Sequence, residues 1–368
     1  MDKLQVLAIV PEGVEDIAKQ EAEEMLGVDV SCERGFILFS ISHLKDALRF
    51  AYFAHTVIRV MLLADKIAVN NPMELSQILK NSKPVMPFPI QTGLKFAARS
   101  YNPDTKAIEE ALGGYIHKEL KLEVDLGNPD VIFLSFLDGN NLYYGIDVAG
   151  IDLSKREYKV FLNSSALKAT IAFSLLKIGG WSMKKILLDP FCGSGEIAIE
   201  AALYKSGISP HHFNKSKFLL SRLLNVDMAE FDRKTDGGKE AIFALDKKFS
   251  SVSSAKKNAK IANVVNHVKF SRLDMSWLDT KFDKKTVDIL VTNPPRISKF
   301  SDKKAIMKVY KELFYQAEFV LKDDGKIVIL TTNKDEFLGY ASEYKFKLIH
   351  ERKVYSGKQQ LDVMVFSK

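Results

Sequence analysis

Cysteine is scarce in this sequence of 368 residues, which contains only Cys32 and Cys192. Two cysteines cannot form a disulfide framework or a cysteine-rich zinc site, so we expect no metal ion. Long apolar runs are also missing. The longest, residues 50–64, is interrupted by a histidine and an arginine, so we expect no association with a membrane. The first residues, Met1-Asp2-Lys3, do not begin an apolar signal peptide, and a cytoplasmic protein is therefore expected.

Positive charge is in short supply in the first part of the chain. Residues 1–164 hold 17 Lys and Arg side chains against 23 Asp and Glu, whereas residues 165–368 hold 36 against 23. The whole chain has a formal net charge of +7 at pH 7, which suits a polyanionic partner. Because the positive field belongs mainly to the second part, the first part must contact any nucleic acid through a local patch. The length predicts two or three domains.

A strand, a sharp turn and a helix start are predicted near the middle of the chain. A short apolar run before Asp189 predicts a buried strand, and an apolar helix start follows the glycine turn (residues 192–195). Gly193 and Gly195 allow a tight turn and the close approach of a ligand. The turn lacks the third glycine of a dinucleotide-binding fingerprint and the Lys-Ser/Thr pair of a P-loop. The acid before it suits a cationic or amine-bearing ligand better than a pyrophosphate.

The segment Asp189-Pro190-Phe191-Cys192-Gly193-Ser194-Gly195 resembles the first motif of class I methyltransferases that use S-adenosylmethionine, in particular the branch that modifies guanosine in RNA. The resemblance implies S-adenosylmethionine as cofactor and an α/β fold, with a Rossmann-like methyltransferase domain of seven strands over residues 165–368. Upstream, Asn163 or Ser164 is expected to cap a helix. Relatives have a proline in place of Ser164, and their element contacts the methionine end of the cofactor. The cofactor-binding residues implied in these two segments are Ser165, Ala166, Leu167, Asp189, Phe191, Cys192, Gly193, Ser194 and Gly195.

Two further acids follow the next two predicted strands. Asp246 ends the strand 240–246, and Asp274 ends the strand 268–275. A carboxylate after the second strand of such a sheet accepts both ribose hydroxyls of a nucleotide-like ligand. Asp274 could accept the adenine amino group, and Met275 could cover the ring. A lone acid at a strand end is more often solvated, but the placement of these acids after successive strands favours a cofactor site.

A rigid stop, Asn293-Pro294-Pro295, follows the predicted strand 287–292. An exocyclic amine of a nucleobase is a weak nucleophile because its lone pair is delocalised into the ring. The Asn293 side-chain oxygen and the Pro294 carbonyl can bind its two hydrogens and turn the lone pair toward a sulfonium methyl group. Two prolines hold these acceptors rigidly, and the base must leave its stack to reach them. We therefore expect Asn293, Pro294 and Pro295 to be catalytic, with Asn293 also facing the cofactor.

The next position, Arg296, departs from the family pattern. Amino-methyltransferases of this branch usually have an aromatic residue after the second proline, which would stack on the target base. Here Arg296 could stack through its guanidinium plane, or Phe300 could take the aromatic's place. We count Arg296 among the catalytic residues.

The first part of the chain predicts two α+β units. Residues 1–60 are expected to form a ferredoxin-like domain, and residues 61–152 a second domain joined to the methyltransferase domain by a linker, 153–164. In the second domain we expect a strand at 95–100, a helix from Lys106, and a hairpin over 131–148 with Asp-Gly-Asn at its turn.

This order resembles the THUMP domain, an RNA-binding module of tRNA-modifying enzymes. The matching segments are Phe96-Ala97-Ala98-Arg99, Val124-Asp125-Leu126, Asn128-Pro129-Asp130 and residues 145–153. The resemblance implies that the module grips the 3′ acceptor end of tRNA. Lys95, Arg99 and Lys106 are the candidates for phosphate contacts, although a purely solvated position for each remains open.

Together these features favour a monomeric enzyme that methylates N2 of a guanosine in tRNA near the acceptor stem, with position 6 preferred. Three alternatives remain open. One is a non-catalytic or weakly active RNA-binding protein that retains the cofactor fold, which Arg296 favours. Another is a methyltransferase that acts on a guanosine of ribosomal RNA. Adenine or glutamine methylation shares the Asn-Pro-Pro logic but does not explain the THUMP-like module.

Overall fold

Two compact units make up the computed structural model of the chain. Unit 1 comprises Met1–Val10, Ala18–Leu153 and Phe213–Phe231, and unit 2 comprises Pro11–Ile17, Ser154–His212 and Asp232–Lys368. The structure describes residues 3–69, 75, 79, 86–102, 105–163, 166–233, 235, 241–298 and 301–368.

Eight of the described strands form the sheet of unit 1, in the spatial order β2-β3-β1-β4-β8-β7-β5-β6. Pairing is antiparallel from β2 to β7, whereas β5 runs parallel to both β7 and β6. The strands are β1 (Leu4–Ile9), β2 (Val30–Glu33), β3 (Phe36–Ile41), β4 (Arg59–Ala68), β5 (Lys95–Ser100), β6 (Glu123–Val124), β7 (Val131–Asp138) and β8 (Asn141–Asp147).

Several predicted elements of unit 1 are present. Strand β5 occupies Lys95–Ser100, helix α4 begins at Lys106, and the β7–β8 hairpin turns at Gly139 with φ +55°. The helices are α1 (Glu15–Leu26, of which Ala18 onward lies in unit 1), α2 (Leu44–Phe53), α4 (Lys106–Leu120), α7 (Leu219–Leu223), η2 (His212–Lys217) and η3 (Met228–Phe231). Phe218, Leu220 and Met228 pack into the same apolar core as β1, β4 and β8. Segment 213–231, which falls within the predicted methyltransferase span 165–368, therefore completes unit 1.

The sheet of unit 2 has the order β11-β10-β9-β12-β13-β15-β14 among the described residues. Strands β9 to β13 run parallel, and β15 is antiparallel to both β13 and β14. The strands are β9 (Leu187–Asp189), β10 (Ile242–Asp246), β11 (Val268–Arg272), β12 (Val287–Thr292), β13 (Leu321–Thr331), β14 (Lys347–Ser356) and β15 (Gln359–Ser367).

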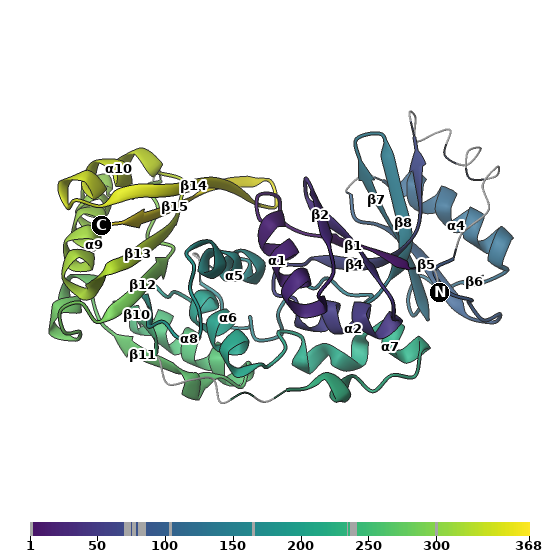
Figure 1. The fold of residues 1–368 in the computed structure, drawn as a ribbon, viewed down its shortest axis with the longest axis horizontal. Helices are drawn as coiled ribbons and strands as arrows, with labels where there is room; N and C mark the ends of the chain where they lie inside the picture. The colour runs from purple at the N-terminus through teal and green to yellow at the C-terminus, as the bar shows by residue number, and fades with distance from the viewer. Residues whose placement is uncertain are drawn as a thin grey trace. The chain divides into compact units, whose positions relative to one another are not determined.

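Helices cover both faces of this sheet (Figure 1). Side chains alternate along a strand, so Ile289 and Val291 pack on one face with α5, α6 and α8, whereas Leu290 packs on the other with α9 and α10. Both faces are buried, which explains why these strands are nearly continuous apolar runs. The helices are α5 (Ala169–Ile178), α6 (Glu196–Ser206), α8 (Phe249–Ile261), α9 (Lys303–Val320), α10 (Lys334–Glu343), η4 (Val265–His267) and η5 (Met275–Thr280).

Strand β9 lies between β10 and β12, so the chain leaves it in one direction for β10 and β11 and in the other for β12 and β13. Such a reversal of strand order opens a crevice at the carboxyl ends of the parallel strands. The predicted segments after β9, β10 and β12 all emerge at that edge. The expected Rossmann-like α/β domain is confirmed.

One predicted helix start is wrong. Helix α5 begins at Ala169 with Lys168 as its N-cap, rather than at Asn163, and Ser164 lies outside the described residues. The Lys168 carbonyl accepts the first bond of the helix, from the Ala172 amide, whereas the Leu167 carbonyl accepts a hydrogen bond from the Lys159 ammonium group.

No helix in the described part of the chain combines the length and the apolar character that crossing a bilayer requires.

Candidate active site

The glycine turn joins β9 to α6 through two residues with left-handed backbone angles. Gly193 has φ +53° and Gly195 has φ +93°, and Gly195 is the N-cap of α6. A Cβ on Gly195 would lie 3.0 Å from the Cβ of Ala255, so a side chain there would also collide with α8. Glycine is required at this position both by the backbone conformation and by the close approach of α8.

Asp189 is the buried acid at the end of β9, with 1% of its surface exposed. Its Oδ1 accepts hydrogen bonds from Thr292 Oγ1 at 2.6 Å and from the Phe191 amide at 3.2 Å. Burial raises the pKa of Asp189 to about 7, and the nearby carboxylates of Asp246 and Glu196 add to the rise against these two hydrogen bonds. The site therefore holds a carboxyl group that a cation would stabilise in its charged form.

Asp246, at the end of β10, links the neighbouring strand end to the glycine turn. Its carboxylate accepts from the Gly193 amide at 3.2 Å and from the Lys248 amide at 2.8 Å. At the end of β11, Asp274 caps η5 by accepting from the Ser276 amide at 3.2 Å, and its side chain is exposed.

The proline loop (residues 293–296) follows β12. Asn293 is 8% exposed, and the Arg296 Nη2 donates to its Oδ1 at 3.4 Å. Burial lowers the pKa of the Arg296 guanidinium from its usual value. The Tyr310 hydroxyl on α9 donates to the Pro295 carbonyl at 2.6 Å. Loop and helix are thus joined by a short hydrogen bond beside the reactive position.

Asn333 and the Tyr310–Phe337 ring pair support the backbone at and after the proline loop. Asn333 is the second residue after β13, and its Oδ1 accepts a hydrogen bond from the Ile297 amide at 3.1 Å. The ring of Tyr310 stacks on Phe337 with centroids 4.0 Å apart, and burial raises the pKa of Tyr310 to about 12. Its hydroxyl therefore remains a donor across the physiological pH range.

A cavity of about 640 Å³ opens at this edge of the sheet, within the usual size of a ligand site. It brings together most of the residues predicted for the cofactor and for catalysis. Its predicted residues are Ala166, Leu167, Phe191, Asp246, Asp274, Met275, Asn293, Pro294, Pro295 and Arg296.

A smaller hollow shares Leu167, Phe191 and Asn293 with that cavity, and Asp189, Cys192, Gly193, Glu196 and Ile197 complete its described lining. Asn293 and Gly193, from two different strand ends, therefore face one space.

The other predicted residues lie elsewhere. Ser194 and Gly195 are described but line neither space: the Ser194 hydroxyl instead bonds the Glu196 carboxylate at 2.9 Å. Ser165 and Phe300 fall outside the described residues. The three bases predicted to contact RNA, Lys95, Arg99 and Lys106, belong to unit 1.

Sequence reasoning missed the part of the lining that comes from the C-terminal hairpin. Ser356, Gln359 and Leu361 reach the cavity from the β14–β15 turn, and Val309 reaches it from α9. Nothing in the residues of this turn indicated that it lies at the active edge of the sheet. Lys247 and Lys248 could have been found because they directly follow Asp246.

The strand order and the two loops at the switch point define a class I methyltransferase fold. The chain belongs to the family of RMKL-like methyltransferase domains (UPF0020), whose model matches residues 156–362, more than half of the chain. The expected S-adenosylmethionine-dependent methyltransferase domain is thereby confirmed.

Relatives of known name match nearly the full length. The tRNA (guanine(6)-N2)-methyltransferase of Methanocaldococcus jannaschii is 28% identical over 365 residues, 94% of this chain and 95% of the relative. The enzyme of the same name from Archaeoglobus fulgidus is 27% identical over 374 residues, 98% of this chain and 91% of the relative. Among solved structures, SMU.472, crystallised with SAH, is 22% identical and shares the fold with a TM-score of 0.80 over 100% of this chain and 99% of that one.

The residues at the cavity fit S-adenosylmethionine. The buried Asp189 carboxyl matches the cationic amino group of the methionine end, because a positive charge would relieve its raised pKa. Asp246 has lone pairs that could accept the ribose hydroxyls, and Phe191 and Met275 line the cavity with apolar surface that would suit an adenine ring. No cluster of three or more His, Cys, Asp or Glu side chains suited to a metal ion occurs among the described residues.

Proposed function

We propose that this protein transfers a methyl group from S-adenosylmethionine to the exocyclic N2 amine of a guanosine in tRNA, near the acceptor stem, with position 6 preferred. One observation carries the proposal: a single cavity joins the cofactor residues after β9 and β10 to the proline loop after β12. The family and the names of two nearly full-length relatives support the choice of substrate.

The cofactor side of the proposed site holds the donor in a fixed orientation. When bound, S-adenosylmethionine supplies an electrophilic methyl group on a positively charged sulfur. The Asp189 carboxylate neutralises its amino group, and Asp246 accepts hydrogen bonds from its ribose. The Asp246 carboxylate also accepts a hydrogen bond from the Gly193 amide at 3.2 Å. The same side chain would therefore position both the ribose and the glycine turn. Fixing one reactant in this way removes much of the entropic cost of the encounter.

The proline loop orients the acceptor amine. Asn293 Oδ1 and the Pro294 carbonyl accept the two N2 hydrogens, which directs the nitrogen lone pair toward the methyl carbon. The N–C bond forms as the S–C bond breaks, and the bonding pair stays on sulfur, which becomes neutral. The amine then loses one proton to solvent. No covalent enzyme intermediate is required.

We propose that Arg296 exchanges partners when the base enters. Its guanidinium donates to Asn293 Oδ1, the same oxygen that the N2 amine would use. An incoming amine replaces this contact and frees a planar cation beside the base. A guanidinium plane can stack on a nucleobase, which would fill the role of the aromatic residue that this loop lacks.

Unit 1 is the proposed RNA-binding part. We propose residues 61–152 as a THUMP domain and residues 1–60, of which Pro11–Ile17 lie in unit 2, as a ferredoxin-like domain. The proposed linker, residues 153–164, lies in unit 2 from Ser154 onward. Lys95 pairs with Asp125 at 3.5 Å, Lys106 pairs with Glu110 at 3.6 Å, and Arg99 donates to the Leu126 carbonyl at 2.6 Å. The two exposed lysine pairs are weak and can reopen toward phosphate. The proposal is for a monomer that acts in the cytoplasm on tRNA.

Nucleoside mass spectrometry tests the function. Unmodified tRNA incubated with the protein and S-adenosylmethionine should gain N2-methylguanosine, and Asn293→Ala should abolish the product while its affinity for S-adenosylhomocysteine stays within about twofold. A methylated adenosine, or product only on ribosomal RNA, would contradict the proposal. Cofactor binding without methyl transfer to any RNA would instead indicate a non-catalytic binding protein.

A further inference from the structure

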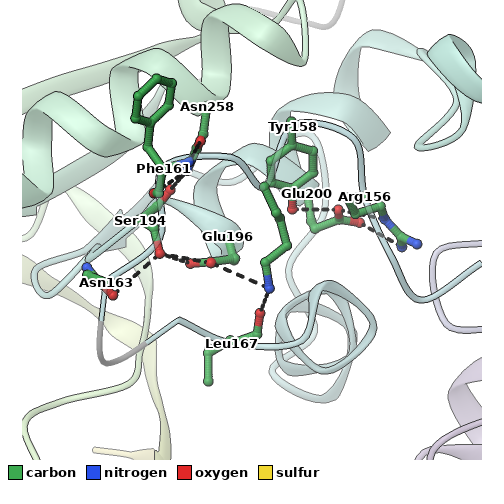
Figure 2. Close-up of polar contacts among 10 residues, drawn as sticks. Arg156, Tyr158, Phe161, Asn163, Leu167, Ser194, Glu196, Glu200 and Asn258 are labelled. Atoms are coloured by element: carbon green, nitrogen blue, oxygen red, sulfur yellow. Dashed lines mark hydrogen bonds and ion pairs between the residues drawn. The ribbon is translucent and has the colours of Figure 1, made fainter.

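The segment that leads into the cavity, residues 156–163, belongs to unit 2 and is tied to the rest of that unit at three places (Figure 2). We name it the approach segment. At its beginning, Arg156 and Glu200 form an ion pair with both side chains fully buried, through contacts of 3.1 and 3.3 Å. The Tyr158 hydroxyl donates to the same carboxylate at 2.9 Å. Moving one partner away would leave the other charge buried without a counter-charge, which is energetically costly. This first tie therefore anchors the segment on α6.

The second tie is made by Lys159. Its ammonium group donates to the Leu167 carbonyl and lies 3.7 Å from the Glu196 carboxylate. Glu196 in turn accepts from the Ser194 hydroxyl at 2.9 Å. Burial raises the pKa of Glu196, whereas the Lys159 charge lowers it. Lys159 therefore connects a cavity-lining residue to the glycine turn through a largely buried carboxylate.

The third tie is the side chain of Asn258, on α8, which has no exposed surface. Its Oδ1 accepts from the Phe161 amide at 2.9 Å, and its Nδ2 donates to the Phe161 carbonyl at 3.0 Å. The same Nδ2 donates to the Ser194 carbonyl at 2.9 Å. One amide thus uses both donors and an acceptor to join the approach segment to the glycine turn.

The second tie reaches the wall of the cavity at Leu167, and the third lies two residues from that wall. Asn163, two residues after Phe161, lines the cavity, as do Ala166 and Leu167. Figure 2 shows Asn163 beside Ser194, and the Ser194 hydroxyl lies 3.4 Å from Asn163 Oδ1. Lys159 and Asn258 therefore hold the glycine turn next to the wall that Asn163, Ala166 and Leu167 form.

We propose that Lys159 and Asn258 are positioning residues for the cofactor: they set the distance between the approach segment and the glycine turn, and so pre-form the pocket for the methionine end of S-adenosylmethionine. Neither residue lines the cavity or the smaller hollow in the described part of the chain. The inference rests on the proposed position of the cofactor in this cavity, but it does not depend on which RNA is methylated.

Replacing Lys159 or Asn258 should lower the affinity for the cofactor more than it lowers kcat. Without the ties, the wall samples other positions, and the cofactor must order it on binding. Once the cofactor is bound, Asn293 and the amine meet as before. The affinity for S-adenosylhomocysteine should therefore fall by about tenfold or more, and KM for S-adenosylmethionine should rise in proportion, while kcat at saturation stays within about twofold.

Unit 1 contains a matched control for Asn258, because another asparagine side chain there makes the same two hydrogen bonds to one residue's backbone. The Asn102 side chain binds both backbone groups of Leu137, at 2.7 and 3.0 Å, as Asn258 binds those of Phe161. Asn102→Ala and Asn258→Ala should both lower the melting temperature. Only Asn258→Ala should lose affinity for S-adenosylhomocysteine by calorimetry. For Lys159, Lys159→Met should lose affinity, and Lys159→Arg, which keeps the charge and a donor, should recover most of it.

A loss of affinity of about fivefold or more in Asn258→Ala and Lys159→Met, with recovery in Lys159→Arg, supports the inference. A smaller loss, or an equal loss in Asn102→Ala, overturns it and leaves the two side chains with a structural role only. If the intact protein binds S-adenosylhomocysteine but does not methylate tRNA, the proposed function fails while the inference is still tested.

Discussion

Asp189 is a nearly fully buried carboxyl group beside the smaller hollow. At the end of β9 it has two hydrogen-bond donors, Thr292 Oγ1 and the Phe191 amide, and two acidic neighbours. The charged form is thus disfavoured until a cation arrives. The residue that suits the cofactor's amino group is therefore a source of instability in the protein without cofactor.

The first prediction concerns the stability of Asp189→Asn. The folded pKa of about 7 lies above the ordinary 3.8, so the contribution of Asp189 to stability is complete below about pH 4 and is lost as pH rises toward 7. Asparagine stays neutral. Above pH 7 the variant should exceed the wild type in free energy of unfolding, by up to about 4 kcal/mol, and the two should converge near pH 4. Urea unfolding at several pH values measures the difference.

The same variant should lose affinity for the cofactor. In the wild type, the affinity for S-adenosylhomocysteine should rise between about pH 6 and 8, as Asp189 becomes available as a carboxylate. In Asp189→Asn the affinity should be lower and nearly flat over that range. A pH profile shared by both proteins would remove Asp189 from the amino-group site.

At the scale of elements, the reactive loop is held by parts of the chain that follow it. Tyr310 on α9 bonds the proline loop at the Pro295 carbonyl, and Asn333 after β13 bonds the amide of Ile297, the residue that follows the loop. Prolines stiffen the loop from within, and these two contacts fix its direction relative to the sheet. The geometry of Asn293 thus depends on α9 as much as on β12.

Tyr310→Phe tests this dependence. The ring and its stacking on Phe337 remain, but the hydrogen bond to the Pro295 carbonyl is lost. We expect kcat to fall by about tenfold, because a misplaced acceptor pair orients the amine poorly, with little change in affinity for S-adenosylhomocysteine. Methylation kinetics together with calorimetry would show this split. Equal losses in kcat and in cofactor affinity would mean that the whole site had been disturbed.

Local features of this fold could be predicted from the sequence, whereas contacts between distant side chains could not. Segments whose function lies in local order were predictable: the turn at Gly193 and Gly195 and the stop after β12 are contiguous and chemically specific. Contacts made by distant side chains were not. Nothing near Asn258 indicates that it binds Phe161 and Ser194, because its environment depends on how α8 packs against α6. The reach of the β14–β15 turn into the cavity depends in the same way on sheet order.

At the scale of the whole molecule, each unit is completed by a segment from elsewhere in the sequence. Phe218 lies far along the chain, but it is fully buried in the core of unit 1, with its ring edge-on to Tyr52 at 6.0 Å. In unit 2, Arg352 on β14 binds Asp16 at 2.6 and 3.0 Å, and Val14 and Ile17 join its core. Boundaries drawn in sequence order therefore cut through both cores.

Phe218→Ala should destabilise unit 1, although the position lies within the sequence span of the methyltransferase family match. Truncating a buried phenylalanine to alanine lowers the free energy of unfolding by about 3–5 kcal/mol. Hydrogen exchange should accelerate in β4 and β8 and stay unchanged in β12 and β13. Phe213→Ala, in the same segment but at a side chain that is 54% exposed, serves as the control. Faster exchange confined to unit 2 would contradict this assignment of the segment.

The placement of Phe218, Leu220 and Met228 in the first core bears on how the protein is made. A nascent chain emerges from the ribosome from its N-terminus, and most domains can fold as soon as their last residue is free. Here the first core stays open until Phe231 has been translated, well into the methyltransferase sequence. Until then, the apolar side chains that Phe218, Leu220 and Met228 cover in the folded protein lack these partners.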